Sequence, residues 1–582
     1  MNPNWDLSYL YKGFDDPAFL ADLKRFPEEI KVEQAILDGG DDPQTKLEKL
    51  TDQQEVLGAL ADRLSSFCNL TQAVDANDAD ATKYLNVLDV IFNDSRIVSS
   101  AITRYIGSLA NLEDLIAASP KLQKVAFHLR ESAENAHHTI PEAVEPWILE
   151  MSLSGGSAFS QLRDKLDSTH TANYRGQEIP LSAVRGLAYD ADASVRKDAY
   201  EAEIASYKKM ELPMSYCLNA VKMEARTLSK AKGYPSVLDM TLSDSRMDRA
   251  TLDAMLTAIR EYLPHFRRYM KAKAKLLGHQ NGLPFYDLFA PVGQNVHTYT
   301  VEEAREMLVR LMGQFTPEMG KFIDNAFEQR WIDIYPREGK TGGAFCSPVH
   351  FADRSLVMTN FTGSFSDVST IAHELGHAWH NRCLAGLPYS LIDTPMPLAE
   401  TASIFNEQLL AHMVLKDASP DEQLSLLEGS LMETNQTIVD IYSRYLFETE
   451  VIDTRADHAM NVDELKDAML RAQEASYGDG LDPEIRHPYM WACKSHYYSS
   501  GYNFYNLPYA FGELFAKGVF AQYLQKGAAF VPDYCRLLRS CGSGTIADVA
   551  ASVGIDVRNP DFWRSSLEVV KGNIDKFCEL VK

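Results

Sequence analysis

The chain has 582 residues, of which 45% are hydrophobic and 24% charged, a composition typical of a globular protein with a sizeable core. Its formal net charge of −24 argues against general binding to nucleic acid or to an anionic membrane surface, because both are negatively charged. No apolar run is long enough to span a bilayer, and residues 1–6 lack the features of a signal peptide. The eight cysteines are scattered without a CxxC pair, which favours reduced thiols and a cytoplasmic location.

The first 150 residues predict a succession of amphipathic helices, since apolar residues recur at three- and four-residue steps. The expected helices cover residues 17–25, 44–67, 75–93, 99–116 and 120–135. The pattern changes around residues 152–185, where residues 173–177 predict the turn of a small hairpin within a helical body.

Longer helices are expected further along the chain. Their predicted bounds are 193–210, 248–277, 301–315 and 317–330. The second of them carries Lys271, Lys273 and Lys275 near its end, and we expect these lysines to form a solvated basic face.

Two short β-prone segments, 342–346 and 356–361, come next and lead directly into a further helix. That helix is predicted over residues 367–385, with Ser366 or Asp367 as its N-cap. The pattern therefore predicts a small strand pair packed beside one helix.

This helix contains the HExxH pattern, as His373, Glu374 and His377. Residues at positions i and i+4 lie on one face of a helix, so both imidazoles can reach one metal ion while Glu374 reaches a water molecule beside it. The plainer alternative is a core helix whose two histidines are satisfied by ordinary hydrogen bonds.

Catalytic zinc needs three protein ligands, so a third ligand must come from elsewhere in the chain. His380 shares the helix, but one straight helix cannot easily direct three imidazoles at one ion. Cys383 would fit a longer motif only if glycine stood at position 380. Glu400 lies near the start of the next predicted helix and completes a His₂Glu set, with Glu407 placed to orient a ligand histidine. The alternative for Glu400 is a plain surface acid.

Together these segments resemble the oligoendopeptidase F group of the thimet-type zinc oligopeptidases. The resemblance covers residues 200–582 well and residues 1–200 more loosely. The segments that carry it are 342–344, 359–363, 370–377, 397–407 and 496–512.

The resemblance implies a mostly α fold, with a large two-lobed helical body around a deep substrate channel and a small β-sheet beside the zinc helix. It implies an N-terminal helical oligopeptidase F-type region at 1–200 and a zinc metallopeptidase catalytic domain at 201–582. The implied activity is that of a cytosolic zinc endopeptidase that cuts short peptides and holds one Zn²⁺ per chain.

Residues 496–512 are rich in tyrosine, for which core packing is the simpler explanation. In the family, a histidine and one or more tyrosines from this region stabilise the oxyanion of the tetrahedral intermediate. His496 and Tyr509 match those residues best by position, and Tyr502 and Tyr505 compete for the same role.

The expected mechanism is hydrolysis by a metal-activated water molecule. His373, His377 and Glu400 would hold the zinc ion, and Glu374 would act as general base. The preceding strands would bind an extended peptide along one edge. The alternative is a structural hairpin packed on the helix.

Two other functions stay open. The first is a zinc carboxypeptidase on a similar helical scaffold, which would need a positive group for the terminal carboxylate of its substrate. The second is a helical binding or scaffold protein with a structural or inactive metal site, which predicts loss of the glutamate of HExxH, yet Glu374 is present. The sequence indicates no particular oligomeric state.

Overall fold

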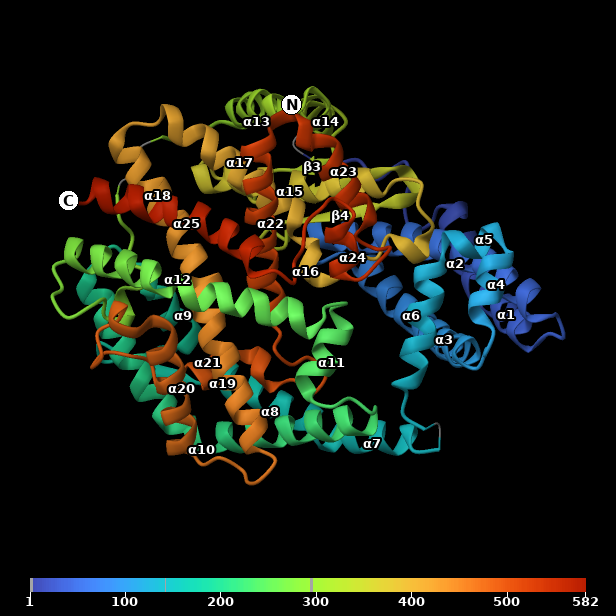
Figure 1. Ribbon diagram of the computed structural model, residues 1–582, viewed down its shortest axis with the longest axis horizontal. Coiled ribbons are helices and arrows are strands. Elements are labelled where there is room, and N and C mark those ends of the chain that lie inside the picture. The colour runs from blue at the N-terminus through green and yellow to red at the C-terminus, as the bar shows by residue number, and fades with distance from the viewer. Residues whose placement is uncertain (1–3, 142, 294–296) are drawn as a thin grey trace. The chain divides into compact units, whose positions relative to one another are not determined.

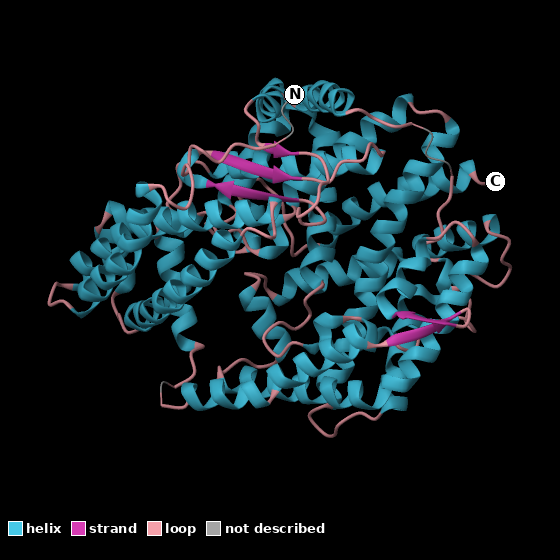
Figure 2. Ribbon diagram, turned by 180° about the vertical axis from the view of Figure 1, so that it is seen from behind, coloured by secondary structure: helices cyan, strands magenta, loops and turns pink. Residues whose placement is uncertain are grey.

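The computed structural model describes residues 4–141, 143–293 and 297–582, which are mostly helical and carry two small sheets (Figures 1 and 2). The mostly α prediction is confirmed. No signal peptide is expected from residues 1–6, and residues 1–3 of that segment lie outside the described residues.

The chain divides into two compact units, each built from three separate stretches. The first unit comprises Met1–Thr139, Val296–Val414 and Gln522–Ile555. The second comprises Ile140–Asn295, Leu415–Ala521 and Asp556–Lys582. This division follows packing and does not test the predicted boundary at residue 200, which stays a prediction, as does the deep channel.

The first unit contains the N-terminal helices, the larger sheet and the helices beside it. Its elements are α1 (Pro17–Asp38), α2 (Pro43–Val74), α3 (Ala79–Gly107), α4 (Leu112–Ala118), α5 (Pro120–Lys124), α6 (Ala126–His137), α13 (Val301–Phe315), α14 (Pro317–Glu328), β3 (Ile332–Asp333), β4 (Phe345–Val349), β5 (Arg354–Met358), α15 (Phe365–Leu384), α16 (Met396–Ala399), most of α17 (Thr401–Asp417), α23 (Val531–Ser540) and α24 (Ile546–Ala551).

The second unit is helical apart from one hairpin. Its elements are α7 (Glu145–Ser154), α8 (Gly156–Thr169), β1 (Thr171–Tyr174), β2 (Gln177–Pro180), α9 (Leu181–Gly186), α10 (Ala193–Ala231), α11 (Val237–Asp244), α12 (Arg249–Leu276), α18 (Pro420–Asn435), α19 (Ile441–Thr454), α20 (Val462–Tyr477), α21 (Met490–Cys493), most of α22 (Leu507–Lys526) and α25 (Pro560–Leu580).

The N-terminal region is helical as predicted, but the bounds and the division of its helices differ. A single helix, α3, runs through the place where two helices were expected, because the polar residues 93–96 contain neither glycine nor proline and do not break it. The predicted hairpin is confirmed as the antiparallel pair β1 and β2, with Arg175 and Gly176 at positive φ in its turn.

The predicted solvated lysine face of α12 is wrong for Lys273. This side chain is buried, and its ammonium group donates hydrogen bonds to Glu428 Oε1 at 2.5 Å and to the carbonyl oxygen of Leu288 at 2.9 Å. Residues two apart on a helix point to nearly opposite sides, so Lys271 and Lys275 remain partly or fully solvated while Lys273 turns inward. A buried ammonium group is tolerated there because it is paired and hydrogen-bonded.

The larger sheet has the strand order β3-β5-β4, with β3 parallel to β5 and β4 antiparallel to it (Figure 2). Strand β4 is therefore an edge strand, and α15 packs against both β4 and β5. The side chain of Asn381 donates a hydrogen bond to Ser355 Oγ at 3.1 Å, which ties the helix to the sheet. The small sheet predicted beside this helix is confirmed.

Helix α15 begins slightly earlier than expected. Its N-cap is Ser364 rather than Ser366 or Asp367, and Asp367 completes the capping box by accepting from the backbone N–H of Ser364. The same carboxylate also accepts from the hydroxyl and backbone N–H of Thr362. This network fixes the start of the helix that carries HExxH.

Candidate metal centre

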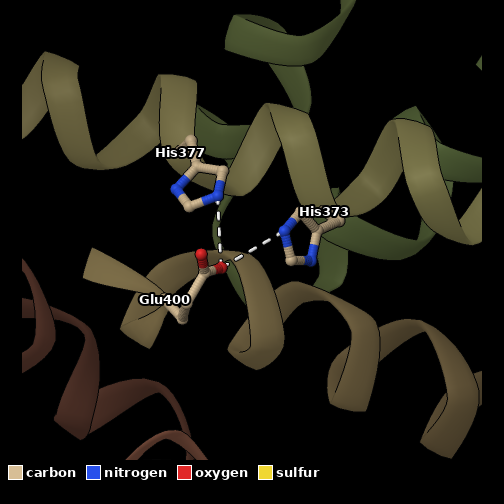
Figure 3. Close-up of side chains that lie close together, drawn as sticks. All are labelled: His373, His377 and Glu400. Atoms are coloured by element: carbon tan, nitrogen blue, oxygen red, sulfur yellow. Dashed lines mark ion pairs between the residues drawn. The ribbon is translucent and has the colours of Figure 1, made fainter. Parts of the chain in front are cut away.

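Helix α15 presents His373 and His377 on one face, as the spacing predicts (Figure 3). The centroids of the two imidazole rings lie 4.9 Å apart. Both side chains are about three-quarters buried, so their ring nitrogens face a sheltered site rather than open solvent.

Glu400 lies at the junction between α16 and α17, directly opposite the two histidines (Figure 3). Its Oε2 is 3.3 Å from His373 Nε2 and 3.3 Å from His377 Nε2. One ligand atom from each of the three residues lies within 4.8 Å of the others. The third candidate from the sequence is thus brought to the two histidines.

These distances fit a tetrahedral cation. Nitrogen and oxygen donors at about 2.0–2.2 Å from a tetrahedral zinc ion lie about 3.3–3.5 Å from one another. The two nitrogen–oxygen distances of 3.3 Å agree with that spacing. Two imidazoles and one carboxylate are also the donor set of catalytic zinc sites that keep a position open.

Two side chains outside the ligand set hold it in place. Glu407 Oε1 lies 3.0 Å from His373 Nδ1, so the ring donates its Nδ1–H to Glu407, and this bond orients Nε2 towards the ligand cluster. Ser403 donates its hydroxyl to Glu400 Oε2 at 2.7 Å. The sequence indicated Glu407 but not Ser403, although its position one turn after Glu400 was a usable signal.

The charges around the site favour a cation. Burial lowers the pKa of His373, but the hydrogen bonds and negative charges of Glu400 and Glu407 outweigh it and raise the pKa to about 10. Burial raises the pKa of Glu400, yet its hydrogen bonds to His373 and His377 hold it well below the usual range. The same negative field that retains protons here would attract a divalent cation.

Glu374 lies beside the ligands without belonging to them. It is only 6% exposed, and burial raises the pKa of its carboxyl group above the usual value, although His373 and His377 act in the opposite direction. Its charge also reaches Cys346 on strand β4 and adds to the effect of burial in raising the pKa of that thiol. The carboxylate is therefore near both the ligand histidines and strand β4.

Neither His380 nor Cys383 joins the ligand cluster. His380 is buried, donates a ring N–H to the carbonyl oxygen of Leu538 at 3.1 Å, and has its pKa lowered to about 4, chiefly by burial. Cys383 shares a hydrogen bond with the thiol of Cys535 on α23. Both residues anchor α15 to α23.

Gly376 allows α15 and α17 to approach closely. A Cβ atom at position 376 would lie 2.5 Å from the carbonyl oxygen of Ala402 and 2.6 Å from Cα of Ser403. Asn406 on α17 also donates to the carbonyl oxygen of Ala372 at 3.1 Å. Glu400 and Glu407 flank this contact. Because glycine has no side chain at position 376, α17 can lie close enough to α15 for both carboxylates to reach the histidines.

Replacing Gly376 by Ala is expected to destabilise the protein by about 1–3 kcal/mol, because the added methyl group meets backbone atoms that cannot rotate away. The affinity for zinc should fall together with the stability, since α15 and α17 must move apart to make room for the methyl group. Chemical denaturation and zinc titration would measure the two effects.

Gly429, inside α18, is the matched control because a Cβ atom there meets nothing within 4 Å. Gly429→Ala should leave stability unchanged or raise it by about 0.5–1 kcal/mol, the usual gain for alanine over glycine in a helix. Wild-type stability and zinc affinity in Gly376→Ala would show that the close approach is unimportant.

The aromatic residues predicted near the C-terminus lie in the second unit, whereas the candidate metal ligands lie in the first. The ring of His496 stacks on Tyr505 at a centroid distance of 5.9 Å, and the hydroxyl groups of Tyr505 and Tyr509 are 3.3 Å apart. Tyr502, 72% exposed, has its ring centroid 6.5 Å from that of Tyr505. The neighbouring Tyr497 is buried.

His496 carries a neutral imidazole. Burial, together with the nearby charge of Arg444, lowers its pKa to about 3. Within the described residues, its Nε2 atom is buried and has no hydrogen-bond partner. The structure thus gathers His496, Tyr502, Tyr505 and Tyr509 into one cluster, with one unused ring nitrogen and several hydroxyl groups.

Comparison with known proteins identifies the family. The profile of peptidase family M3 matches residues 186–569, more than half of the chain. The chain belongs to peptidase family M3. A second profile, that of oligopeptidase F, matches residues 108–171. This M3 chain is therefore a peptidase, and the resemblance to the oligoendopeptidase F group is confirmed.

Relatives of this M3 peptidase match it along nearly its whole length. An oligoendopeptidase F homolog of Lactococcus lactis is 23% identical over 597 residues, covering 99% of this chain and 97% of the relative. Oligopeptidase PepF of Bacillus subtilis is 23% identical over 549 residues, covering 92% of this chain and 81% of the relative.

Solved structures share the fold. A chain from Chlamydophila abortus superposes with a TM-score of 0.87 at 23% identity, covering 100% of this chain and 99% of the other. Oligoendopeptidase-F from Enterococcus faecium gives a TM-score of 0.68 at 17% identity, with 97% and 98% coverage. Among the described residues, no helix combines the length and apolarity required to cross a membrane.

Proposed function

We propose that this M3 peptidase is a zinc-dependent endopeptidase that hydrolyses internal peptide bonds of short oligopeptides. The observation that carries the proposal is the cluster of His373, His377 and Glu400, with donor spacing suited to tetrahedral zinc and with Glu374 beside it. One zinc ion per chain would be held by these three residues. A bound zinc ion supplies Lewis acidity, which polarises a carbonyl group and acidifies water.

Glu374 is the proposed general base. Its carboxylate accepts a proton from the attacking water molecule and passes the proton to the amine that leaves. Burial supports this role, because a raised pKa brings the carboxyl group closer to the pH at which it must both accept and donate a proton. No covalent bond to the chain forms in this scheme.

His496 and Tyr509 are proposed to donate hydrogen bonds to the oxyanion, with Tyr502 as a further donor. The clustering of these residues with Tyr505 supports the assignment, as does the buried Nε2 of His496, which has no partner within the described residues. A neutral imidazole donates through one ring N–H, so it can serve as a donor without carrying charge.

The outer edge of β4, opposite β5, is the proposed binding site for the backbone of the peptide. A peptide added as an extra strand would pair with an edge strand through main-chain hydrogen bonds. Cys346 on β4 feels the charge of Glu374, so a peptide on this strand would pass beside the general base.

The proposed setting is the cytoplasm, with short peptides as the partners and no binding to nucleic acid or membranes. Two observations support it. All eight cysteines are free thiols, as expected in a reducing compartment. The net charge of −24 would repel nucleic acid and anionic lipid.

The proposal is tested by incubating a mixture of peptides capped at both ends, of several lengths, and identifying the products by mass spectrometry. Cleavage at internal bonds is expected, with loss of activity in a chelator and recovery on addition of zinc. A zinc carboxypeptidase would leave C-terminally capped peptides intact. Equal cleavage in chelator, or equally fast cleavage of folded proteins, would contradict the zinc-dependent oligopeptidase.

A further inference from the structure

The second unit contains a cavity of about 140 Å³, separate from the residues discussed above. It lies among α9, α10 and the segment that includes α21. Its polar lining is formed chiefly by Arg185, Tyr189, Tyr200, Glu203, His487 and Lys494. Tyr189 is 57% exposed, so the cavity opens to solvent on that side.

His487 is a buried polar side chain without a hydrogen-bond partner for its ring. It is 1% exposed, and within the described residues neither ring nitrogen makes a hydrogen bond. Its nearest ionic neighbour is Glu203, with Oε1 3.5 Å from Nε2. Gln473 holds the residue by bonding both its backbone N–H and its carbonyl oxygen. The ring is therefore paired only loosely, through Nε2, and its buried Nδ1 is unsatisfied, so a ligand that pairs with the ring gains affinity.

Three cationic side chains also line the cavity. Arg185 lies with Nε 3.2 Å from Glu203 Oε1. The side chain of Lys494 makes no hydrogen bond or ion pair within the part of the chain that the structure describes. Arg196, by contrast, is fully used, because it pairs with Asp287 at 2.7 Å and donates to the carbonyl oxygens of residues 190 and 191.

The carboxylates nearby do not balance these cations. Burial opposes the charged form of Glu203, but His487, Arg185 and Lys494 hold its pKa below the usual value, so it is anionic. Asp440, which also feels the charge of Lys494, is already paired with Arg444. One cavity carboxylate, Glu203, therefore faces Arg185, Lys494 and an imidazole, which leaves positive charge for a ligand.

We infer that this cavity is a subsite for a carboxylate group, bound by Lys494, Arg185 and the ring of His487. The cavity is smaller than the about 300–1,000 Å³ typical of whole small-molecule ligands, so it suits one anionic group rather than a peptide. The inference rests on the proposed peptidase function where the carboxylate belongs to a substrate. Lys494 directly precedes the turn Ser495–Tyr498 that carries His496, which links the cavity to the proposed oxyanion donors.

The carboxylate has two sources: a substrate peptide or a free small carboxylate. The first arm of the test compares KM for one N-capped peptide with a free C-terminus and for its C-terminal amide. The second arm measures the shift of the melting temperature as acetate is titrated at constant ionic strength. Both arms use the wild-type holoenzyme, Lys494→Met and the control Lys275→Met, which removes an exposed lysine from α12 in the same unit.

With the wild type, KM for the free acid should be lower than for the amide by about tenfold or more, as hydrogen bonds to charged groups usually contribute. Lys494→Met should abolish this preference without changing KM for the amide, and Lys275→Met should retain it. A saturable acetate shift that Lys494→Met removes, with no preference between the peptides, would identify a free carboxylate as the ligand.

Equal KM values for acid and amide together with no acetate shift specific to Lys494 would overturn the inference. Failure of the proposed function looks different, because neither peptide would then be cleaved in a chelator-sensitive way. The acetate arm would still report on the cavity in that case.

Discussion

Replacing Glu374 by Gln is expected to lower the turnover of a capped peptide by about 10³-fold or more, a loss within the usual contribution of a general base. Glutamine keeps the shape of the side chain but cannot accept a proton. Zinc content should stay near one ion per chain, because Glu374 is not among the three ligands. Turnover, zinc content and melting temperature would be measured on one preparation of the variant. The melting temperature shows whether the variant is folded.

Glu338 offers a matched control, since it is an exposed glutamate of the same unit. Glu338→Gln makes the same chemical change and should leave turnover unchanged. Full activity in Glu374→Gln would remove this residue from the mechanism. Loss of both activity and zinc would instead place it in the metal site.

The second large effect is expected from Glu400→Ala. This change removes one of three ligands and leaves only His373 and His377. Zinc affinity should fall by more than about 100-fold, because the loss of an outer partner alone costs about 10–100-fold. After dialysis, the variant should hold almost no zinc and show no peptide cleavage, and added zinc should raise its melting temperature less than that of the wild type.

Glu407→Gln is expected to lower zinc affinity less than Glu400→Ala does, so the two variants are compared. It removes the carboxylate that accepts from His373 Nδ1, but leaves all three ligands in place. Zinc affinity should fall by about 10–100-fold, and high zinc concentrations should restore activity. A Glu400→Ala variant that retains one zinc ion per chain would refute the ligand assignment, whatever the result at Glu407.

Much of the candidate site could be predicted because its chemistry lies in two short local patterns. The i and i+4 spacing of His373 and His377 fixes their common face once the segment is helical. Prolines before Glu400 end the return loop and start the next helix, which places this carboxylate near a helix start. The position of Glu407 two turns further along then follows from helical periodicity.

Other features depend on partners that the sequence does not place. Lys273 was expected in solvent because its helix is rich in lysine, but its environment is decided by Glu428, far along the chain. The need for glycine at position 376 becomes evident only when the backbone of Ala402 is seen against it. The cavity beside Lys494 is assembled from distant segments, so no local pattern marks it.

The discontinuity of the two units has a consequence for biosynthesis. The first unit is completed by residues up to Ile555 and the second by residues up to Lys582. Domains usually fold in order as the chain leaves the ribosome, but here neither unit can close until its last stretch, which ends at Ile555 or at Lys582, has emerged. At about 5–20 residues per second, a chain of this length takes on the order of 30–120 s to synthesise.

The delay affects the packing of helix α15. Its contacts with α23, including the bond from His380 to Leu538, form only after the C-terminal stretch has emerged. Until then, the apolar face of the helix that carries both candidate histidine ligands lacks one of its supports. The packing of α15 is thus expected to be completed only after α23 has emerged.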